Sequence, residues 1–209
     1  MFKICAISDT HIQHYDLKIP KCDIFIFAGD AEIRALDELH MFNDLLGTIN
    51  TKYCITIAGN HDTYLQKIGQ AWCEHLFTNA IYLQDKEVTI EGLKIYGSPW
   101  TPTFMSWAFM KPRRSADLSN VWKQIPENLD ILIGHGVPYK ILDKSYYENE
   151  HVGCEVLQRE IFNKMPKIYI GGHIHEGHGY IEKEGVKFYN VSILDEKYKL
   201  VNKPTIIEI

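Results

Sequence analysis

The sequence has few features of a secreted or membrane-bound protein. Its cysteines are odd in number and contain no Cys-x-x-Cys pair; they are Cys5, Cys22, Cys54, Cys73 and Cys154. We interpret them as reduced thiols rather than as zinc ligands or disulfide partners. No apolar run approaches the ~20 residues that a membrane helix requires. Residues 1–4 lead directly into a strand pattern, without a signal peptide. These absences predict a cytoplasmic protein with no membrane segment.

Positive charge is also scarce. Lysine and arginine total 22 against 27 aspartate and glutamate residues, which gives a formal net charge of −5. This balance argues against stable binding to duplex nucleic acid, which requires a basic face. It does not exclude a small anionic ligand, because bound metal can supply positive charge locally. We find no repeat, linker or low-complexity segment, so residues 1–209 are expected to form one domain. The oligomeric state stays open.

Short apolar runs rich in β-branched residues indicate an α/β fold. Residues 2–8, 23–28 and 53–58 are typical of strands covered on both faces. Between the second and third runs, apolar residues at helical spacing predict a helix over residues 32–46, and this strand–helix–strand unit indicates a parallel sheet. Two further helices are expected, at 64–76 and 151–164. Further strands are predicted at 80–83, 87–90, 93–97, 130–133, 167–170, 180–183, 186–191 and 205–209.

Aspartate, asparagine and histidine residues follow five of the predicted strands. The motifs are Asp9-Thr10-His11, Gly29-Asp30, Gly59-Asn60-His61-Asp62, Gly134-His135 and Gly172-His173-Ile174-His175. Each is weak alone, since Asp9 could cap a helix and Asn60 could serve a turn. Ligand-type residues at so many strand ends nevertheless favour a shared metal site, because open α/β sheets build their sites at the carboxyl ends of strands.

The order of these motifs resembles the signature of the calcineurin-like metallophosphoesterases. The similarity extends to the branch called metallophosphoesterase domain-containing proteins, and it covers nearly the whole chain. Segments that carry the branch resemblance are residues 7–11, 57–61, 81–85, 95–102, 152–154 and 172–177. The resemblance implies a four-layer αββα sandwich, in which two mixed sheets are flanked by helices.

The resemblance also implies a centre with two divalent metal ions. One ion would be held by Asp9, His11, Asp30 and His175, and the other by Asp30, Asn60, His135 and His173. Asp30 would bridge the two ions. A mixed nitrogen and oxygen donor set accepts Mn²⁺, Fe²⁺, Zn²⁺ or Ni²⁺. Mn²⁺ is our first expectation for activity in vitro.

The catalytic and substrate-binding residues are less defined. His61 is the candidate acid for the leaving group or a contact to the phosphate, together with Asn60. Asp62 could orient His61 or cap the helix that follows. Residues 98–117 are expected to be irregular because prolines interrupt them. In that segment Trp100 could stack on a nucleobase, and Arg113 and Arg114 could pair with phosphate, or the aromatic side chains could simply close the edge of the core.

The leading hypothesis is a phosphodiesterase that hydrolyses small anionic phosphate esters by attack of a metal-activated hydroxide. The branch resemblance suggests cyclic nucleotides, of the 2′,3′ or 3′,5′ kind. Residues 29–34 lack the Asp-then-Arg pattern of the superfamily's protein phosphatases, which argues against that activity. A phosphomonoesterase, a nuclease and a metal-binding scaffold with little turnover are the alternatives. A nuclease should show a basic groove, of which this acidic chain gives little sign.

Overall fold

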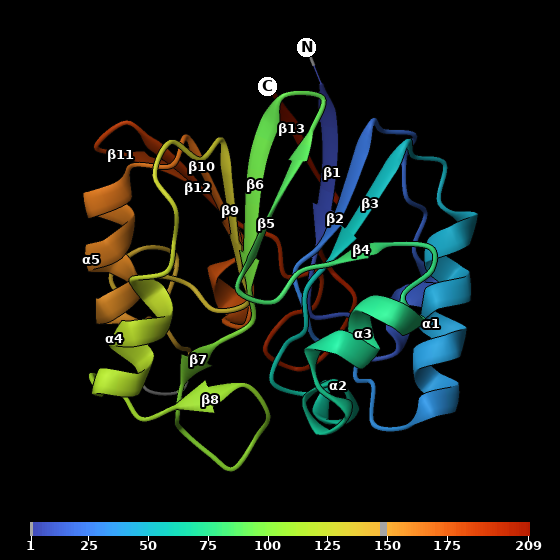
Figure 1. The fold of residues 1–209 in the computed structure, drawn as a ribbon, viewed down its shortest axis with the longest axis horizontal. Helices are drawn as coiled ribbons and strands as arrows, with labels where there is room; N and C mark the ends of the chain where they lie inside the picture. Colours follow the sequence, from blue (N-terminus) through green and yellow to red (C-terminus); the bar gives the residue numbers. More distant parts are fainter. Residues whose placement is uncertain (1, 147–149) are drawn as a thin grey trace.

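Two mixed β-sheets pack face to face at the centre of the molecule (Figure 1). The computed structural model describes residues 2–146 and 150–209. The first sheet has the order β13-β1-β2-β3-β4, and its strands are β1 (Lys3–Ile7), β2 (Ile24–Phe27), β3 (Tyr53–Thr56), β4 (Ile81–Tyr82) and β13 (Thr205–Glu208). Neighbouring strands from β1 to β4 run parallel, and β13 pairs antiparallel with β1.

The second sheet has the order β11-β12-β10-β9-β6-β5. Its strands are β5 (Lys86–Ile90), β6 (Leu93–Ser98), β9 (Ile131–Gly134), β10 (Ile168–Gly171), β11 (Gly179–Lys183) and β12 (Val186–Asn190). The four inner strands are parallel, and antiparallel hairpin partners, β5 and β11, form the edges. A separate parallel pair consists of β7 (Thr101–Pro102) and β8 (Met110–Lys111).

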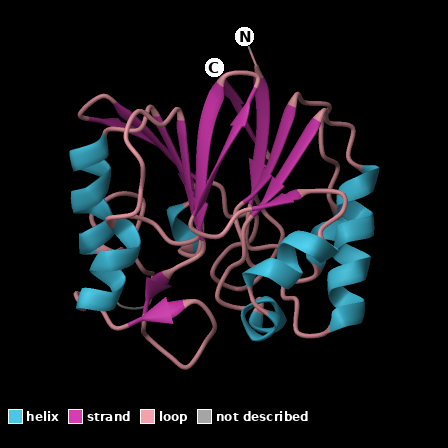
Figure 2. Ribbon diagram, viewed as in Figure 1, coloured by secondary structure: helices cyan, strands magenta, loops and turns pink. Residues whose placement is uncertain are grey.

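Helices cover the outer faces of both sheets (Figure 2). The helices α1 (Leu36–Thr48), α2 (Thr63–Ile68) and α3 (Gln70–Leu76) lie on the side of the first sheet, and α4 (Ala116–Trp122) and α5 (Glu155–Lys164) lie on the side of the second. Two 3₁₀ turns, η1 (Gln13–Asp16) and η2 (His175–Gly177), lie in the loops after β1 and β10.

Three apolar cores separate these four layers. The central core joins the facing sides of the two sheets and includes Ile26 and Ile133. A second core lies between the first sheet and its helices, with Phe27 packed on Phe42 of α1. A third core lies beneath α4 and α5 and contains the fully buried Trp122. The implied four-layer α/β sandwich is therefore confirmed.

Local chemistry explains where the helices differ from the predicted ranges. The helix expected over 64–76 is two helices, because Gly69 separates them with a left-handed φ of 82°. The first helix begins at Leu36 rather than at residue 32, and the Glu38 side chain accepts a hydrogen bond from the Ala35 N–H. The helix α4 begins inside the segment predicted to be irregular, with Ser115 accepting a capping bond from the Leu118 N–H.

The parallel strands of both sheets end on the same side of the molecule, where the long loops gather (Figure 1). A single bridge between Ser8 and Ser192 joins the two sheets at this side. All five cysteines are buried and free, as predicted. Within residues 2–146 and 150–209, none of the helices is long and apolar enough to span a bilayer.

Candidate metal centre

The seven predicted metal ligands come from both sheets and meet at this side. Among the described residues, two groups of candidate ligand atoms consist of predicted metal ligands alone: Asp9 with His11 and His175, and Asp30 with His135 and His173. A third group joins His11 to Glu32 and His61. Within each group the ligand atoms lie within 4.8 Å of one another. Asn60 joins the second group, because its Oδ1 lies 2.9 Å from His135 Nε2.

Asp30 lies between the two groups. Its Oδ2 is 3.7 Å from His11 Nε2 and 3.3 Å from His135 Nε2. Its Oδ1 accepts the backbone N–H of His61 at 2.7 Å. Burial alone would raise the pKa of Asp30, but His135 and His11 keep that pKa well below its ordinary value. One carboxylate oxygen therefore faces both groups in its ionised form.

The Asp9 carboxylate is fixed by neighbours from both sheets. It accepts hydrogen bonds from the hydroxyls of Ser8 at 2.5 Å and Ser192 at 2.6 Å, and from the His173 backbone N–H at 2.9 Å. Burial is the largest single influence and favours the neutral form, but His175, His135 and His11 together outweigh it and lower the pKa of Asp9. Asp9 is thus ionised and rigidly oriented, as a ligand for a divalent cation should be.

Two of the candidate histidines are oriented through backbone carbonyls. His135 Nδ1 lies 3.0 Å from the Ala28 carbonyl oxygen, and His175 Nδ1 lies 3.0 Å from that of Asp195. These bonds leave each Nε2 facing its candidate group, which is the usual arrangement for a metal-ligating histidine. Although burial opposes protonation, Asp30 raises the pKa of His135 to about 9. Burial and the charge of His135 lower the pKa of His173 to about 3.

Strained backbone at four candidate ligands and a glycine beside Asp9 allow the ligand side chains to come together. Four of the seven candidate ligands have a left-handed φ, with values of 54° at Asp9, 40° at His11, 63° at Asp30 and 68° at His173. Such strain concentrates at functional sites. A Cβ added to Gly172 would overlap the side chains of Ser8 and Asp9. The glycine in this motif therefore lets the second sheet approach the carboxylate on the first.

The donor set fits divalent metal ions. Among the residues that the structure describes, neither nitrogen of the buried His11 ring has a hydrogen-bond partner. A buried histidine without a partner is costly, and a metal ion would satisfy it. The charged groups that lower the pKa values of the two buried carboxylates, Asp9 and Asp30, are histidines. Cations held by the two groups would balance the negative charge of these carboxylates.

The two predicted catalytic residues lie in the same loop but face different neighbours. The His61 ring stacks on Trp107 at 4.3 Å and meets the His11 ring edge-on at 4.7 Å. Burial lowers the pKa of His61 although Asp30 pulls it upward, and its Nδ1 has no hydrogen-bond partner.

Asp62 lies within the loop structure rather than beside the His61 ring. Its carboxylate accepts the backbone N–H groups of Gly59 at 2.7 Å, Asp30 at 3.0 Å and Ile33 at 3.0 Å. It therefore fastens the loop after β2 to the loop after β3, and its side chain makes no cap bond to α2. Burial and the negative charge of Asp30 raise the pKa of Asp62 to about 7.

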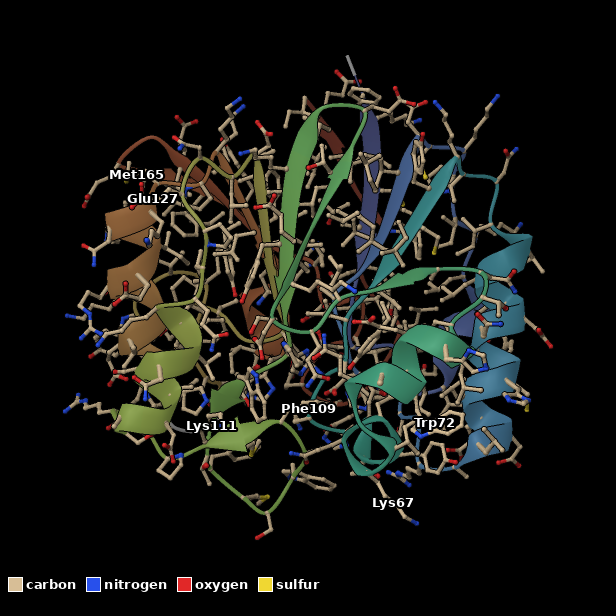
Figure 3. The ribbon with its side chains drawn as sticks, in the orientation of Figure 1. Lys67, Trp72, Phe109, Lys111, Glu127 and Met165 are labelled. Atoms are coloured by element: carbon tan, nitrogen blue, oxygen red, sulfur yellow. The ribbon has the colours of Figure 1, made fainter. Side chains whose placement is uncertain are left out.

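A cavity of about 420 Å³ adjoins the second group, and His173 and His175 form part of its wall. Of the predicted substrate-binding residues outside the metal centre, Arg113 lines this cavity. Trp100 and Arg114 are not among its described lining residues. The Trp100 indole N–H donates to Asp85 at 2.8 Å, and its ring contacts the buried Phe109, which Figure 3 marks beside β8.

Three residues near the centre are missing from the sequence-based site. Glu32 Oε2 lies 3.4 Å from His11 Nδ1, and the Tyr198 ring lies 4.8 Å from the His11 ring. Trp107 stacks on His61. Glu32 could have been found, because it follows Asp30 by two positions in a predicted site loop. Tyr198 belongs to no motif, and only the folded chain brings it to the centre.

Comparisons with known proteins identify the family of the chain. Residues 2–177 match the family described as calcineurin-like phosphoesterase. The chain is 36% identical over 231 residues to metallophosphoesterase domain-containing protein 1 of Homo sapiens, covering 99% of this chain and 71% of the human protein. It is 32% identical over 238 residues to UPF0046 protein T07D4.2 of Caenorhabditis elegans, covering 99% of this chain and 60% of that protein.

The fold is also found among solved structures. A phosphopantetheinyl hydrolase from Mycobacterium tuberculosis superposes with a TM-score of 0.62 at 17% sequence identity, covering 94% of this chain and 90% of that chain. This likeness concerns the fold alone. The family match and the human relative together imply divalent metal ions and phosphoester hydrolysis. The chain belongs to the calcineurin-like phosphoesterases, on the branch of the metallophosphoesterase domain-containing proteins.

Proposed function

We propose that the protein is a phosphodiesterase that hydrolyses small diesters, with 2′,3′- or 3′,5′-cyclic nucleotides as the substrate class. The observation that carries the proposal is the Asp30 carboxylate between two groups of ligand atoms, 3.7 Å from His11 Nε2 and 3.3 Å from His135 Nε2. Divalent cations held beside this carboxylate would supply Lewis-acid stabilisation of the phosphate oxygens and an activated water for attack.

The chain's own residues have separate tasks in this proposal. One ion would be held by Asp9, His11, Asp30 and His175, and the other by Asp30, Asn60, His135 and His173. Mn²⁺ is the expected ion in vitro. His61, half-buried beside His11, contacts the phosphate or gives a proton to the leaving oxygen. Asp62 accepts the backbone N–H groups of Asp30 and Gly59, and so holds the two loops that carry Asp30 and His61.

The size and position of the cavity support a small substrate. About 420 Å³ of space adjoins the candidate ligands His173 and His175, which is within the range of small-molecule sites. Trp107 and Phe104 offer aromatic faces near the two groups, since their rings contact His61 and His173. An organic ester group could lie against such faces while its phosphate meets the metal ions.

The experiment compares a chromogenic diester, bis(4-nitrophenyl) phosphate, with its monoester, 4-nitrophenyl phosphate. Both are assayed with Mn²⁺, after chelation, and after Mn²⁺ is restored. We expect higher kcat/KM for the diester, loss on chelation, and recovery on restoration. The protein is then incubated with 2′,3′-cyclic AMP or 3′,5′-cyclic AMP, and chromatography of the products tests the substrate class. Preference for the monoester would favour a phosphomonoesterase. No turnover by folded protein with bound metal would favour a scaffold.

Asp30→Asn tests the bridging role. Even residues that only orient metal ligands cost about 10- to 100-fold when replaced, so loss of a shared ligand should lower kcat at least about 100-fold. Elemental analysis should show less bound metal than in the unmodified protein. Asp44→Asn, which removes a carboxylate from the exposed side of α1, is the matched control and should change neither quantity. Equal metal content and turnover in Asp30→Asn would contradict the shared-ligand geometry.

A further inference from the structure

The buried ring of His11 has a carboxylate beside each of its two nitrogens. Nε2 lies 3.7 Å from Oδ2 of Asp30, which is one of the predicted metal ligands. Nδ1 lies 3.4 Å from Oε2 of Glu32, which is not. Among the described residues, neither nitrogen has a hydrogen-bond partner. Glu32 therefore lies next to the candidate centre without a place in the predicted ligand set.

The loop after β2 is fixed so that Glu32 lies against His11. The backbone N–H groups of His11 and Ile12 donate to the carbonyls of Asp30 at 3.1 Å and Ala31 at 3.3 Å, which ties this loop to the loop after β1. Glu32 itself has a left-handed φ of 72°. Residues other than glycine seldom adopt this conformation, and such strain concentrates at functional positions. The strained backbone thus accompanies a carboxylate that faces the buried ring.

The two oxygens of the Glu32 carboxylate have different neighbours. Oε1 accepts a hydrogen bond from Nη2 of Arg34, and the two side chains form an ion pair. Oε2 is the oxygen that faces His11. The Glu32 side chain is 14% exposed, whereas that of Arg34 is 54% exposed. Arg34 therefore holds the carboxylate from the solvent side, while the second oxygen is presented to the ring.

The chemistry of imidazole gives the two nitrogens of His11 separate tasks. A neutral ring has one lone pair and one N–H. In metal sites the lone pair binds the ion, and the N–H donates to a carboxylate or a carbonyl that fixes the ring. His135 and His175 already lie against backbone carbonyls through Nδ1. Because Nε2 of His11 faces Asp30, Nδ1 keeps the proton, and Glu32 is an acceptor within reach.

Glu32 also lies near His61, which raises a different possibility. His11, Glu32 and His61 each offer a ligand atom, and these atoms lie within 4.8 Å of one another. A further cation would fit such a group. A neutral imidazole gives its lone pair to one ion only, however, and His11 also belongs to the group with Asp9 and His175. A cation beside Glu32 would therefore compete with the centre for His11, whereas orientation by Glu32 would not.

We propose that Glu32 is a positioning residue, which accepts the Nδ1–H of His11 and directs Nε2 at the metal centre, while Arg34 holds Glu32 in turn. The inference rests on the metal centre of the proposed function and adds two residues to it. A charged acceptor also makes the imidazole a better metal ligand. The separation of 3.4 Å is longer than an ordinary hydrogen bond, so we expect the two side chains to lie slightly closer in the metal-loaded protein.

Calorimetric titration with Mn²⁺ measures the effect of Glu32 on metal affinity. Glu32→Met keeps an unbranched side chain and removes the acceptor, so it should weaken one of the two binding steps about 10- to 100-fold. Glu32→Gln retains a neutral acceptor and should weaken that step less. Arg34→Gln should have a smaller effect than Glu32→Met, because an exposed ion pair is screened by water and salt.

Glu184→Met is the matched control. Glu184 is an exposed glutamate in the turn between β11 and β12 (Figure 1), and its φ of 53° is also left-handed. The same exchange on the same kind of backbone should therefore leave both Mn²⁺ binding steps unchanged. Weakening by this control would show that the loss in Glu32→Met is not specific to the contact with His11.

Nuclear magnetic resonance of the Zn²⁺-loaded protein tests the hydrogen bond itself. Zn²⁺ is diamagnetic and suits the same donor set. We expect a His11 Nδ1–H signal that exchanges slowly with water in the unmodified protein and in Glu32→Gln. In Glu32→Met the signal should broaden or disappear, because its acceptor is gone. A role for Glu32 in packing alone would not distinguish the Gln and Met variants in this way.

Three outcomes would overturn the proposal. One is equal Mn²⁺ affinity in Glu32→Met and the unmodified protein. Another is the loss of one bound ion per chain in Glu32→Met by elemental analysis with affinity for the others unchanged, which would make Glu32 a ligand of a further cation. The third is lower turnover with unchanged metal affinity, which would assign Glu32 to His61 instead.

Failure of the proposed function has a different signature, because both measurements on Glu32 report metal binding and not hydrolysis. A protein that binds Mn²⁺ and shows the expected order of the Glu32 variants, but hydrolyses no diester, would reject the proposed function and retain the role of Glu32. Hydrolysis that depends on Mn²⁺, together with unaltered binding in Glu32→Met, would reject the role of Glu32 and retain the function.

Discussion

At the scale of single residues, the candidate metal ligands are held in place by side chains that are not themselves ligands. Asp62 fastens the loops that carry Asp30 and Asn60 by accepting three backbone N–H groups. Ser192 reaches Asp9 from the second sheet at 2.6 Å. Residues of this kind determine where the ligands point, and ligand orientation is as important to a metal site as ligand identity.

His14 is another buried polar residue, and it lies in the loop after β1 that also carries Asp9 and His11. Unlike those two residues, it is not a candidate metal ligand. It is 7% exposed, its Nδ1 lies 3.0 Å from the Thr10 hydroxyl, and its ring packs against Phe42. Burial lowers the pKa of His14 from its ordinary value of 6.5 to about 4. The folded protein therefore holds His14 neutral at a pH where the unfolded chain would protonate it.

We predict that His14 makes the protein acid-sensitive between pH 6.5 and about pH 4. Because the unfolded state binds this proton more tightly, the stabilisation is complete above pH 6.5 and is lost as the pH falls toward 4. The size is on the order of 2–3 kcal/mol across the window. Urea unfolding at pH 7.5 and 4.5 should show a smaller loss of stability for His14→Gln, which keeps a partner for Thr10. Parallel losses in both proteins would contradict this assignment.

At the scale of elements, the site depends on glycines at the ends of strands. Gly172 follows β10, and the space of its absent side chain is filled by Ser8 and Asp9 of the opposite sheet. Gly92, in the β5–β6 turn, has a different requirement. Its φ is 86°, and a Cβ there would meet no atom within 4 Å. Gly172 is required because there is no space for a side chain, and Gly92 is required because its backbone is left-handed.

We therefore predict different consequences for alanine at these two positions. Gly172→Ala should cost about 1–3 kcal/mol by overpacking, and it should weaken metal binding about 10- to 100-fold by displacing Asp9. Gly92→Ala should cost about 1 kcal/mol through its left-handed backbone and leave metal affinity unchanged. Chemical unfolding and calorimetric titration with Mn²⁺ separate the two effects. Unaltered Mn²⁺ affinity in Gly172→Ala would show that Asp9 tolerates the added methyl group.

Features encoded in short stretches of sequence could be predicted, and features that depend on tertiary packing could not. The runs that became β1, β2 and β3 are almost wholly apolar, so strands and the ligand residues after them could be located directly. The helix α4 was hidden because Pro112 and two arginines precede it, while its start depends on the Ser115 cap. The Trp107–His61 stack joins two loops through tertiary packing, which no local pattern encodes. Similarly, the engagement of Arg113 with residues 152–155 depends on the fold.

At the scale of the whole molecule, the candidate metal centre lies across the junction of the two sheets. Asp9, His11, Asp30 and Asn60 follow strands of the first sheet, whereas His135, His173 and His175 follow strands of the second. The two sheets otherwise meet through the apolar central core and the Ser8–Ser192 bridge. Metal ions bound here would cross-link the two sheets and neutralise two buried carboxylates.

Metal loading should therefore stabilise the entire domain rather than only the loops. A ligand present at 100 times its Kd stabilises the folded state by about 2.7 kcal/mol per site. For a domain of this size, each kcal/mol raises Tm by about 2–4 °C, so Mn²⁺ should raise Tm by about 5–10 °C per site over the chelated protein. Differential scanning calorimetry measures this shift in a single transition. Asp30→Asn, which removes the shared ligand, should lose most of the shift, whereas Asp44→Asn should retain it. An equal rise in both variants would mean that Mn²⁺ stabilises the protein from somewhere other than the junction of the sheets.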